Sequence, residues 1–387
     1  MKQYIPLGDV ISKASVDRCG NAQFPILSIT MKDGLVLQDE KFKKRIASVD
    51  TSDYKVIPRG KLVQGIHIDE ANFGIQDIVD VGIVSPAYKV WDVNSDVVFP
   101  KYLEMVMRSP RSIAFYKSKL NGSVNRRGRM TDGDFLGMPV PYFELSEQMR
   151  IVDIMIRSKA IIEERMQQLL TLDDLIKARF VELFGDMLVN PLNWKQTRLD
   201  GVSNIVSGIT KGRKPKSEEL FEVPYMAVSN VKDGYIDWTT VKTIPATRTE
   251  IEQYRLLPFD VLMTEGGDPD KLGRGAIIHE PPANCIHQNH IFRVRLNQEC
   301  LLPVFFAQYL QQQRAKRYFL GCAKQTTGIA SINMKQLSAL PVLSPPIELQ
   351  RQYAAFVAQI DKSKFSIMAS FPLLKRLPVY QRQEWTI

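Results

Sequence analysis

The sequence predicts two α+β lobes in tandem, each followed by a long helix, with the two helices pairing as an antiparallel coiled coil. Three observations predict this fold class: the second half of the chain repeats landmarks of the first, each half is rich in short strand-like runs, and each half ends in an amphipathic stretch of helical period. A length of 387 residues is enough for two or three domains, at roughly 150 residues per domain.

The repeat is clearest where each half ends. The stretch "MPVPYFELSEQMRI" at residues 138–151 returns as "LPVLSPPIELQRQY" at residues 340–353, so that Pro139 and Pro341 lie 202 positions apart, as do Gln148 and Gln350. Earlier in each half, three further pairs of segments occur in the same order. They are "FPILSITMKDGLV" with "VPYMAVSNVKDGYI", "IPRGKLV" with "LPFDVLM", and "VFPKYLEMVMRS" with "LLPVFFAQYLQQ". Shared turn and strand preferences explain any one pair but not the ordered set.

The two lobes are assigned to residues 1–146 and 186–346. Runs rich in β-branched and aromatic residues, such as "VPYMAVS" and "NHIFRVRL", are separated by Gly, Pro and Asp, which indicates strands joined by turns. One helix is expected after the proline in each lobe, around Tyr102–Met107 and Phe305–Gln313. Each lobe is therefore predicted to be α+β.

The first long helix is predicted over residues 147–185. Its stretch from Glu147 to Phe184 has no Pro or Gly, and 38 residues of helix span roughly 57 Å at 1.5 Å per residue. Ser146 is the expected N-terminal cap and Gly185 the expected stop. Apolar residues repeat every seven positions, which predicts a coiled-coil seam. The seam residues are Met155, Ile162, Leu169, Ile176 and Leu183.

The second helix begins near residue 347, and Tyr353, Ile360 and Ile367 form its matching stripe. The alternative is that each helix packs onto its own lobe, but the seven-residue period favours pairing. Pro372 and Pro378 fall inside the span that the first helix occupies, so we expect this helix to end near Ser370. The rest of residues 347–387 is then an irregular tail, for which a frameshift or a truncation is one explanation.

Composition and charge limit the function. The net charge is +9, and Lys and Arg exceed Asp and Glu in both lobes, which fits a polyanionic partner without proving one. No apolar run reaches 18 residues and the N-terminus lacks a signal peptide, so we expect a cytoplasmic protein without a membrane partner. The four cysteines form no CxxC pair.

Catalytic motifs are missing from the sequence. It has no GxxxxGK[ST] phosphate loop and no Asn-Pro-Pro-aromatic or Asp-Pro-Pro-aromatic tetrapeptide, so no catalytic residue is assigned. Cys285, His287 and His290 are the one candidate metal-ligand set. No second ligand pair accompanies them and the segment runs into a predicted strand, so we favour structural or DNA-facing roles and expect no metal.

Basic residues in Gly-, Asn- and Ser-containing loops are the best candidates for function. Small residues let a backbone approach phosphate, and Arg can bind guanine through two hydrogen bonds. The candidate DNA-binding residues are Lys117, Lys119, Arg126, Arg127, Arg129, Lys211, Arg213, Lys214, Lys271, Arg274, Arg317 and Lys324.

The order lobe, helix, lobe, helix resembles the specificity subunit of type I restriction–modification systems. The resemblance is carried by "MPVPYFELSEQ", "LPVLSPPIELQ", "GIASINMKQLSALPV" and "TEGGDPDKLGRGAI", and it extends to about residue 370. It implies that each lobe is a target recognition domain reading one half of a bipartite site in double-stranded DNA. The helices would then set the unread gap and dock two methyltransferase subunits, with restriction subunits further out where they exist.

The resemblance also implies a non-catalytic subunit. S-adenosylmethionine, ATP and Mg²⁺ would bind to the partner subunits, and this chain would bind no cofactor. Two alternatives stay open. An enzyme acting alone would bind S-adenosylmethionine or metal as the isolated chain, and a stand-alone DNA-binding or coiled-coil adaptor protein would work without restriction partners.

Overall fold

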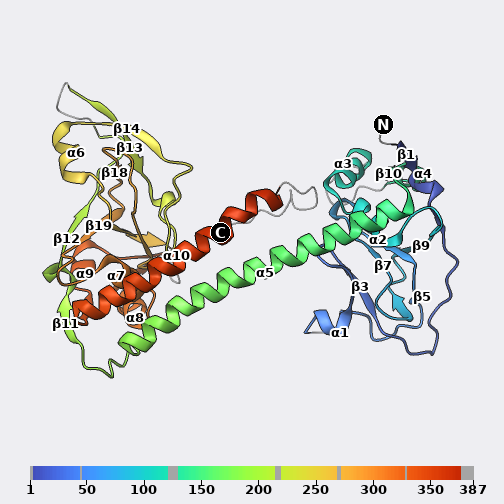
Figure 1. Ribbon diagram of the computed structural model, residues 1–387, viewed down its shortest axis with the longest axis horizontal. Helices are drawn as coiled ribbons and strands as arrows, with labels where there is room; N and C mark the ends of the chain where they lie inside the picture. Colours follow the sequence, from blue (N-terminus) through green and yellow to red (C-terminus); the bar gives the residue numbers. More distant parts are fainter. Residues whose placement is uncertain are drawn as a thin grey trace. The chain divides into compact units, whose positions relative to one another are not determined.

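The computed structural model describes residues 3–43, 46–120, 130–213, 219–267, 272–326 and 329–375 (Figure 1). The chain divides into two compact units, Met1–Met166 with Met368–Ile387, and Gln167–Ile367. We call the globular part of the first unit lobe 1 and that of the second unit lobe 2. The long helices α5 (Leu145–Phe184) and α10 (Ile347–Lys375) each pass from one unit into the other, so the domain limits assigned from the sequence stay a prediction.

Lobe 1 is built on a four-stranded antiparallel sheet in the order β2-β9-β6-β7. These strands are β2 (Ile11–Lys13), β9 (Lys89–Val93), β6 (Leu62–Gln64) and β7 (Phe73–Ile75). Three two-stranded pairs surround it: β1 (Gln3–Pro6) with β10 (Pro139–Tyr142), β3 (Leu27–Thr30) with β4 (Gly34–Leu37), and β5 (Lys55–Pro58) with β8 (Val81–Val84).

Helices cover the core of lobe 1. They are α1 (Gln38–Lys41), α2 (Pro100–Met107), α3 (Pro110–Lys119) and α4 (Asp132–Leu136). Phe73 of the sheet packs against Tyr116 of α3 and Phe135 of α4, with ring centroids 5.5 and 5.8 Å apart. All three rings are at most 2% exposed, so they anchor both helices to the sheet.

Lobe 2 contains a sheet of the same order, β12-β19-β15-β17. Its strands are β12 (Ser203–Ser207), β19 (Ile291–Leu296), β15 (Val261–Thr264) and β17 (Gly275–Ile277). Outside it lie the pair β11 (Lys195–Arg198) and β22 (Pro341–Ser344), the sheet of β14 (Lys242–Ala246), β13 (Phe221–Met226) and β18 (Ile286–His287), and the sheet of β16 (Gly266–Gly267), β21 (Ile329–Ser331) and β20 (Lys324–Thr326). Its helices are α6 (Arg248–Tyr254), α7 (Pro303–Leu310), α8 (Gln313–Cys322) and α9 (Met334–Ser338).

The two lobes therefore share one plan. The central sheets have equivalent strand orders, and in both lobes the first strand pairs antiparallel with the last strand before a long helix, as Pro6 with Pro139 and Arg198 with Pro341. The Lys-Asp-Gly turns also match, because Gly34 and Gly234 both have positive φ (75° and 81°), which favours glycine. The predicted tandem fold with a long helix after each lobe is confirmed.

The helix expected after the proline is present in each lobe, as α2 and α7, but the one in lobe 2 ends at Leu310, short of the predicted Gln313. In both lobes a second helix, which was not predicted, starts within three residues of the first. In lobe 1 the Ser109 hydroxyl accepts a hydrogen bond from the amide of Ser112, and Pro110 occupies the first turn, which starts the new helix.

The limits of the long helices also differ from the prediction. The first helix begins at Leu145, so Ser146 lies inside it, and Gly185 follows its end with φ +73°. The second helix does not end near Ser370 but continues through Pro372 to Lys375. A proline removes one backbone hydrogen bond and crowds the carbonyl four residues earlier, but the residues after it here are the strong helix formers Leu373, Leu374 and Lys375. Residues 376–387, the rest of the expected irregular tail, lie outside the described residues.

Candidate nucleic-acid interface and helix seam

Two of the candidate basic residues in lobe 1 lie on α3. Lys117 and Lys119 are exposed in its last turn, where the Lys119 ammonium lies 3.9 Å from the carboxylate of Asp134. An exposed ion pair at this distance contributes little, and both side chains are exposed, so both ammonium groups are accessible to a polyanion. Arg126, Arg127 and Arg129 follow this helix in the sequence and lie outside the described residues.

Arg213 in lobe 2 has a structural role that its basic loop did not reveal. Its guanidinium forms two hydrogen bonds with the Glu250 carboxylate, at 2.7 and 2.6 Å, and a third with the carbonyl of Pro245. These bonds hold the pKa of Glu250 below its usual value. Arg213 therefore fixes the start of the basic loop to α6, whereas its neighbour Lys211 is exposed.

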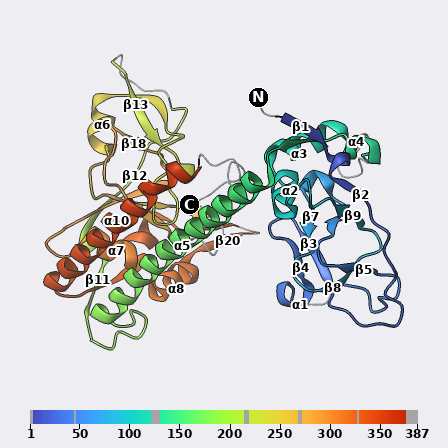
Figure 2. The same cartoon turned by 45° about the vertical axis from the view of Figure 1, so that its right-hand side comes forward.

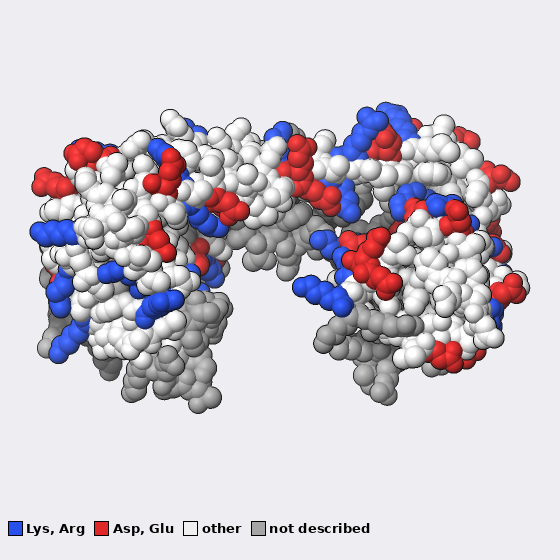
Figure 3. All heavy atoms as spheres, turned by 90° about the horizontal axis from the view of Figure 1, so that it is seen from below, with Lys and Arg blue, Asp and Glu red and all other residues white. Residues whose placement is uncertain are grey.

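Of the other candidates in lobe 2, Arg274 and Arg317 are the ones whose side chains are described. Arg317 is exposed on α8, whereas Arg274 is half-buried and its Nε atom is shielded from solvent. Lys214 and Lys271 lie outside the described residues, and of Lys324 only the backbone, in β20, is described. On the face shown in Figure 3, the coloured Lys and Arg side chains of each lobe stand apart from one another or beside Asp and Glu.

The helix seam joins α5 to α10 within the second unit, where the two helices lie side by side in Figures 1 and 2. The Phe180 and Phe184 rings lie 5.4 and 5.7 Å from that of Tyr353, and the Arg179 guanidinium lies 5.8 Å from the Phe356 ring. Further along, Lys364 forms an ion pair with Asp173. Residues later in α10 thus contact residues earlier in α5, so the two helices are antiparallel.

The predicted seam residues are all at least partly covered. Ile162, Tyr353 and Ile360 are buried, and the remaining members are half-buried. Those remaining members are Met155, Leu169, Ile176, Leu183 and Ile367. The seam is not purely a coiled coil, because Phe180 and Phe184 also pack against Phe305 of α7 in the core of lobe 2.

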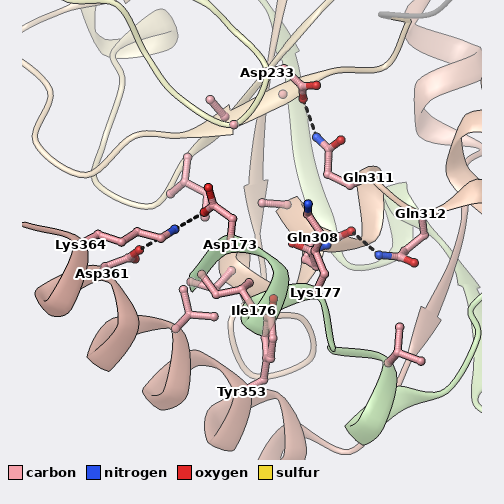
Figure 4. Close-up of a pocket in the computed structure, with 18 of the residues that line it drawn as sticks. Asp173, Ile176, Lys177, Asp233, Gln308, Gln311, Gln312, Tyr353, Asp361 and Lys364 are labelled. Atoms are coloured by element: carbon pink, nitrogen blue, oxygen red, sulfur yellow. Dashed lines mark hydrogen bonds and ion pairs between the residues drawn. The ribbon is translucent and has the colours of Figure 1, made fainter. Parts of the chain in front are cut away.

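A cavity of about 760 Å³ lies between the helix seam and lobe 2 (Figure 4). Ile176 and Tyr353 contribute apolar walls, and Lys364 lies between Asp173 and Asp361. On the lobe side, Gln311 donates a hydrogen bond to Asp233 in the Lys-Asp-Gly turn. The lining of the cavity thus combines apolar side chains with polar side chains that are paired with one another.

The candidate metal ligands do not come together. Cys285 and His287 are fully buried, and the ring nitrogens of His287 face the carbonyl oxygens of Tyr254 and Val206 at 3.0 and 3.3 Å. Burial lowers the pKa of His287 to about 4, and His290 contacts the Glu265 carboxylate instead. Within the described ranges, no three His, Cys, Asp or Glu side chains are grouped so that they could hold a metal ion.

The sequence did not reveal what Gln148 and Gln350 do. They were visible only as equivalent letters in the repeat, yet both side chains are at most 1% exposed and each makes three hydrogen bonds to backbone groups. The signal that could have found them is a polar residue at the same position of two amphipathic helices.

Residues 191–372 match the family model for the type I restriction modification DNA specificity domain. This segment is thus similar to a DNA specificity domain of that family. The match covers lobe 2 and most of α10, and the central sheet of lobe 1 has the equivalent strand order. The resemblance to type I specificity subunits noted in the sequence is confirmed.

Two curated relatives are named specificity subunits of type I restriction enzymes. The putative type I restriction enzyme MjaX specificity subunit of Methanocaldococcus jannaschii is 25% identical over 173 residues, which is 44% of this chain and 40% of the relative. The type I restriction enzyme EcoKI specificity subunit of Escherichia coli K12 is 22% identical over 250 residues, which is 59% of this chain and 51% of the relative. The chain thus spans about half the length of the second relative and 40% of the first.

Solved structures support the fold over nearly the whole chain. A chain from a structure of the type I R-M system, solved to address complex assembly and conformational transition, superimposes with a TM-score of 0.56 at 19% identity, covering 97% of this chain and 95% of that one. The S subunit of a type I restriction-modification system from M. genitalium gives 0.54 at 13% identity, covering 98% and 96%. None of the described helices combines the length and apolar character needed to cross a membrane.

Proposed function

We propose that this chain is the DNA specificity subunit of a type I restriction–modification complex. The observation that carries the proposal is that lobe 1 repeats the central sheet and the first-to-last strand pair of lobe 2, and lobe 2 lies in the segment that matches the specificity domain. Each lobe then reads one half of a bipartite site in double-stranded DNA, and the long helices set the unread gap between the halves.

The partners follow from the same proposal. Two methyltransferase subunits dock on the helices, and restriction subunits join where the system has them, all in the cytoplasm with the DNA. This subunit is non-catalytic and binds no cofactor, so S-adenosylmethionine, ATP and Mg²⁺ belong to the partners. Exposed Lys117, Lys119, Lys211 and Arg317 support an electrostatic contribution to DNA binding, whereas Arg213 supports the loop beside it.

The test is to map methylated bases in the source genome with the gene present and with it deleted. We expect one bipartite motif to lose methylation on deletion. If every motif persists, the stand-alone adaptor becomes the better explanation. Calorimetry of the isolated chain with S-adenosylmethionine gives a second check, because measurable binding would favour an enzyme that acts alone.

A further inference from the structure

Each long helix begins with a buried glutamine that binds the lobe before it. In lobe 1, the Gln148 side-chain oxygen accepts a hydrogen bond from the amide of Phe99 at 2.8 Å. The side-chain nitrogen donates to the carbonyls of Val97 and Phe143 at 3.1 and 2.7 Å. The side chain therefore ties the first turn of α5 to the loop entering α2 and to the exit from β10.

Lobe 2 repeats this arrangement. The Gln350 oxygen accepts from the amide of Leu302 at 2.9 Å, and its nitrogen donates to the carbonyls of Cys300 and Pro345 at 3.1 and 2.8 Å. Leu302 precedes α7 as Phe99 precedes α2, and Pro345 follows β22 as Phe143 follows β10. Two copies with different surrounding side chains have kept the same three backbone contacts. We call Gln148 and Gln350 the junction glutamines.

The chemistry of the site explains why the residue is glutamine. The site offers one amide donor and two carbonyl acceptors, and a neutral side-chain amide supplies one acceptor and two donors. A glutamate at either position would place a buried charge against two carbonyl oxygens. An apolar side chain would leave three backbone groups without partners away from solvent.

A contact at the base of a long helix has a large effect at its far end. Helix α5 has 40 residues, which corresponds to roughly 60 Å at 1.5 Å per residue. A tilt of about 5° at the base would move the far end by about 5 Å, more than the spacing of roughly 3.4 Å between successive base pairs. The apolar contacts of the first turn hold the helix against its lobe, but they are non-directional and define the direction of the helix axis poorly. Three hydrogen bonds to two segments of the lobe define that direction well.

We propose that the junction glutamines are positioning residues that fix the direction in which each long helix leaves its own lobe, and that they thereby determine selectivity for the gap between the half-sites. This inference rests on the proposed function. It assigns gap selectivity to the two helix bases in addition to helix length, and it leaves the choice of bases within each half-site to the lobes.

The experiment compares Gln148→Met and Gln350→Met with Gln167→Met and Gln352→Met in the complex assembled with its methyltransferase subunits. Gln167 and Gln352 are exposed on the same two helices, so they control for the substitution itself. Once the wild-type complex has revealed the motif, methylation is measured on duplexes with the native gap and with gaps one base pair longer or shorter. A second duplex series changes one base within each half-site.

We expect each junction variant to lower the preference for the native gap by roughly fivefold or more, as expected for lost buried hydrogen bonds. The base preference within the half-sites should stay unchanged, and both control variants should keep the wild-type preference for the native gap, which is a ratio between duplexes and does not depend on the total methylation rate. A general weakening of the fold would reduce both preferences together. A junction variant that folds and keeps the full gap preference would overturn the inference.

Milder variants cover a failure to fold. Gln148→Asn and Gln350→Asn keep the amide but are one methylene shorter, so each loses part of the contact set, and a partial loss of gap preference is expected. If these variants also fail to fold, the glutamines are requirements for folding and the inference is wrong. A wild-type complex that methylates without regard to the gap would instead refute the proposed function.

Discussion

The two lobes differ where a long helix leaves them, within the residues that the structure describes. In lobe 2, the surface beside the start of α10 is covered by Phe180 and Phe184 from the end of α5, and both rings are fully buried. The corresponding surface of lobe 1, beside the start of α5, is a largely apolar groove of about 380 Å³. Tyr102, Ile151 and Met155 line this groove.

An arginine at the equivalent point of each lobe shows the same difference. Arg314 of lobe 2 donates to the carbonyls of Met187 and Leu188, in the segment that follows α5. Arg111 of lobe 1 lies instead over the ring of Tyr4, with 4.5 Å between its guanidinium carbon and the ring centroid. The junction glutamines, by contrast, make the same contacts in both lobes. The contacts of the junction glutamines are thus the same in both lobes, whereas those of the two arginines differ with the segment that covers each lobe.

The largest expected effect comes from exchanging a whole lobe. Replacing residues 1–144 with the equivalent lobe of a relative leaves α5 and its Gln148 intact. Because the shared contacts are to backbone groups, we expect the new lobe to dock in the same way. Sequencing of methylated DNA should then show a changed first or second half of the motif, with the other half and the gap unchanged. A change in both halves would mean that the lobes do not read independently.

The sequence predicted the arrangement of lobes and long helices because each has a signal that can be seen in the residues alone. The internal repeat predicted the tandem lobes, the seven-residue period predicted both long helices, and Gly185 predicted the end of the first one. The role of Arg213 could not be predicted, because its partner Glu250 is 37 positions away and a basic loop looks the same with or without it. The end of α10 differs from the prediction because the helix formers Leu373, Leu374 and Lys375 continue the helix past Pro372.

A second prediction concerns the aromatic cover of lobe 2. Phe184→Ala removes a fully buried ring that contacts Phe305 and Tyr353, at centroid distances of 4.8 and 5.7 Å. We expect lobe 2 to lose about 3–5 kcal/mol of unfolding free energy, as is usual for a buried Phe→Ala change. Urea unfolding followed by hydrogen exchange of lobe 2 peptides measures the loss.

Phe365→Ala is the matched control, because Phe365 lies on α10 and is 71% exposed. Its effect should stay within about 0.5 kcal/mol. Peptides from the sheet of lobe 1 should be unaffected by either change. Equal effects of the two substitutions would contradict the view that α5 covers lobe 2 through its aromatic residues.

The third prediction is that the stability of the two lobes depends differently on pH. His287 of lobe 2 is fully buried with its pKa lowered to about 4, whereas His67 of lobe 1 is exposed. Between pH 6.5 and 4 the unfolded chain binds a proton at this histidine that the folded chain does not, so stability falls as the pH falls through that window. From about pH 7 to about pH 5 the expected loss is about 2 kcal/mol.

Urea unfolding with proteolytic detection of each lobe at the two pH values measures this loss. His287→Gln removes the titrating group, and it should flatten the pH dependence of lobe 2 even if it lowers stability at neutral pH. Arg293 and Asp260 also act on His287, and both remain in the variant. An unchanged pH dependence in the variant would assign the acid sensitivity to other groups.

The smallest expected effect is at the ion pair between the helices. Lys364 of α10 is 18% exposed and pairs with Asp173 of α5, which is 51% exposed, while Asp361 lies 3.8 Å from the same ammonium. Asp173→Asn therefore leaves Lys364 a second partner, and exposed pairs contribute little, so we expect a loss of about 0.5 kcal/mol. Added salt should reduce this loss, because salt screens exposed charges.

Asp174→Asn is the control, since Asp174 pairs with Lys177 on its own helix and both are exposed. Urea unfolding at low and high salt compares the two variants. If Asp173→Asn costs as much as Phe184→Ala, charge rather than aromatic packing holds α5 against α10, and the difference between the lobes must be explained by that charge.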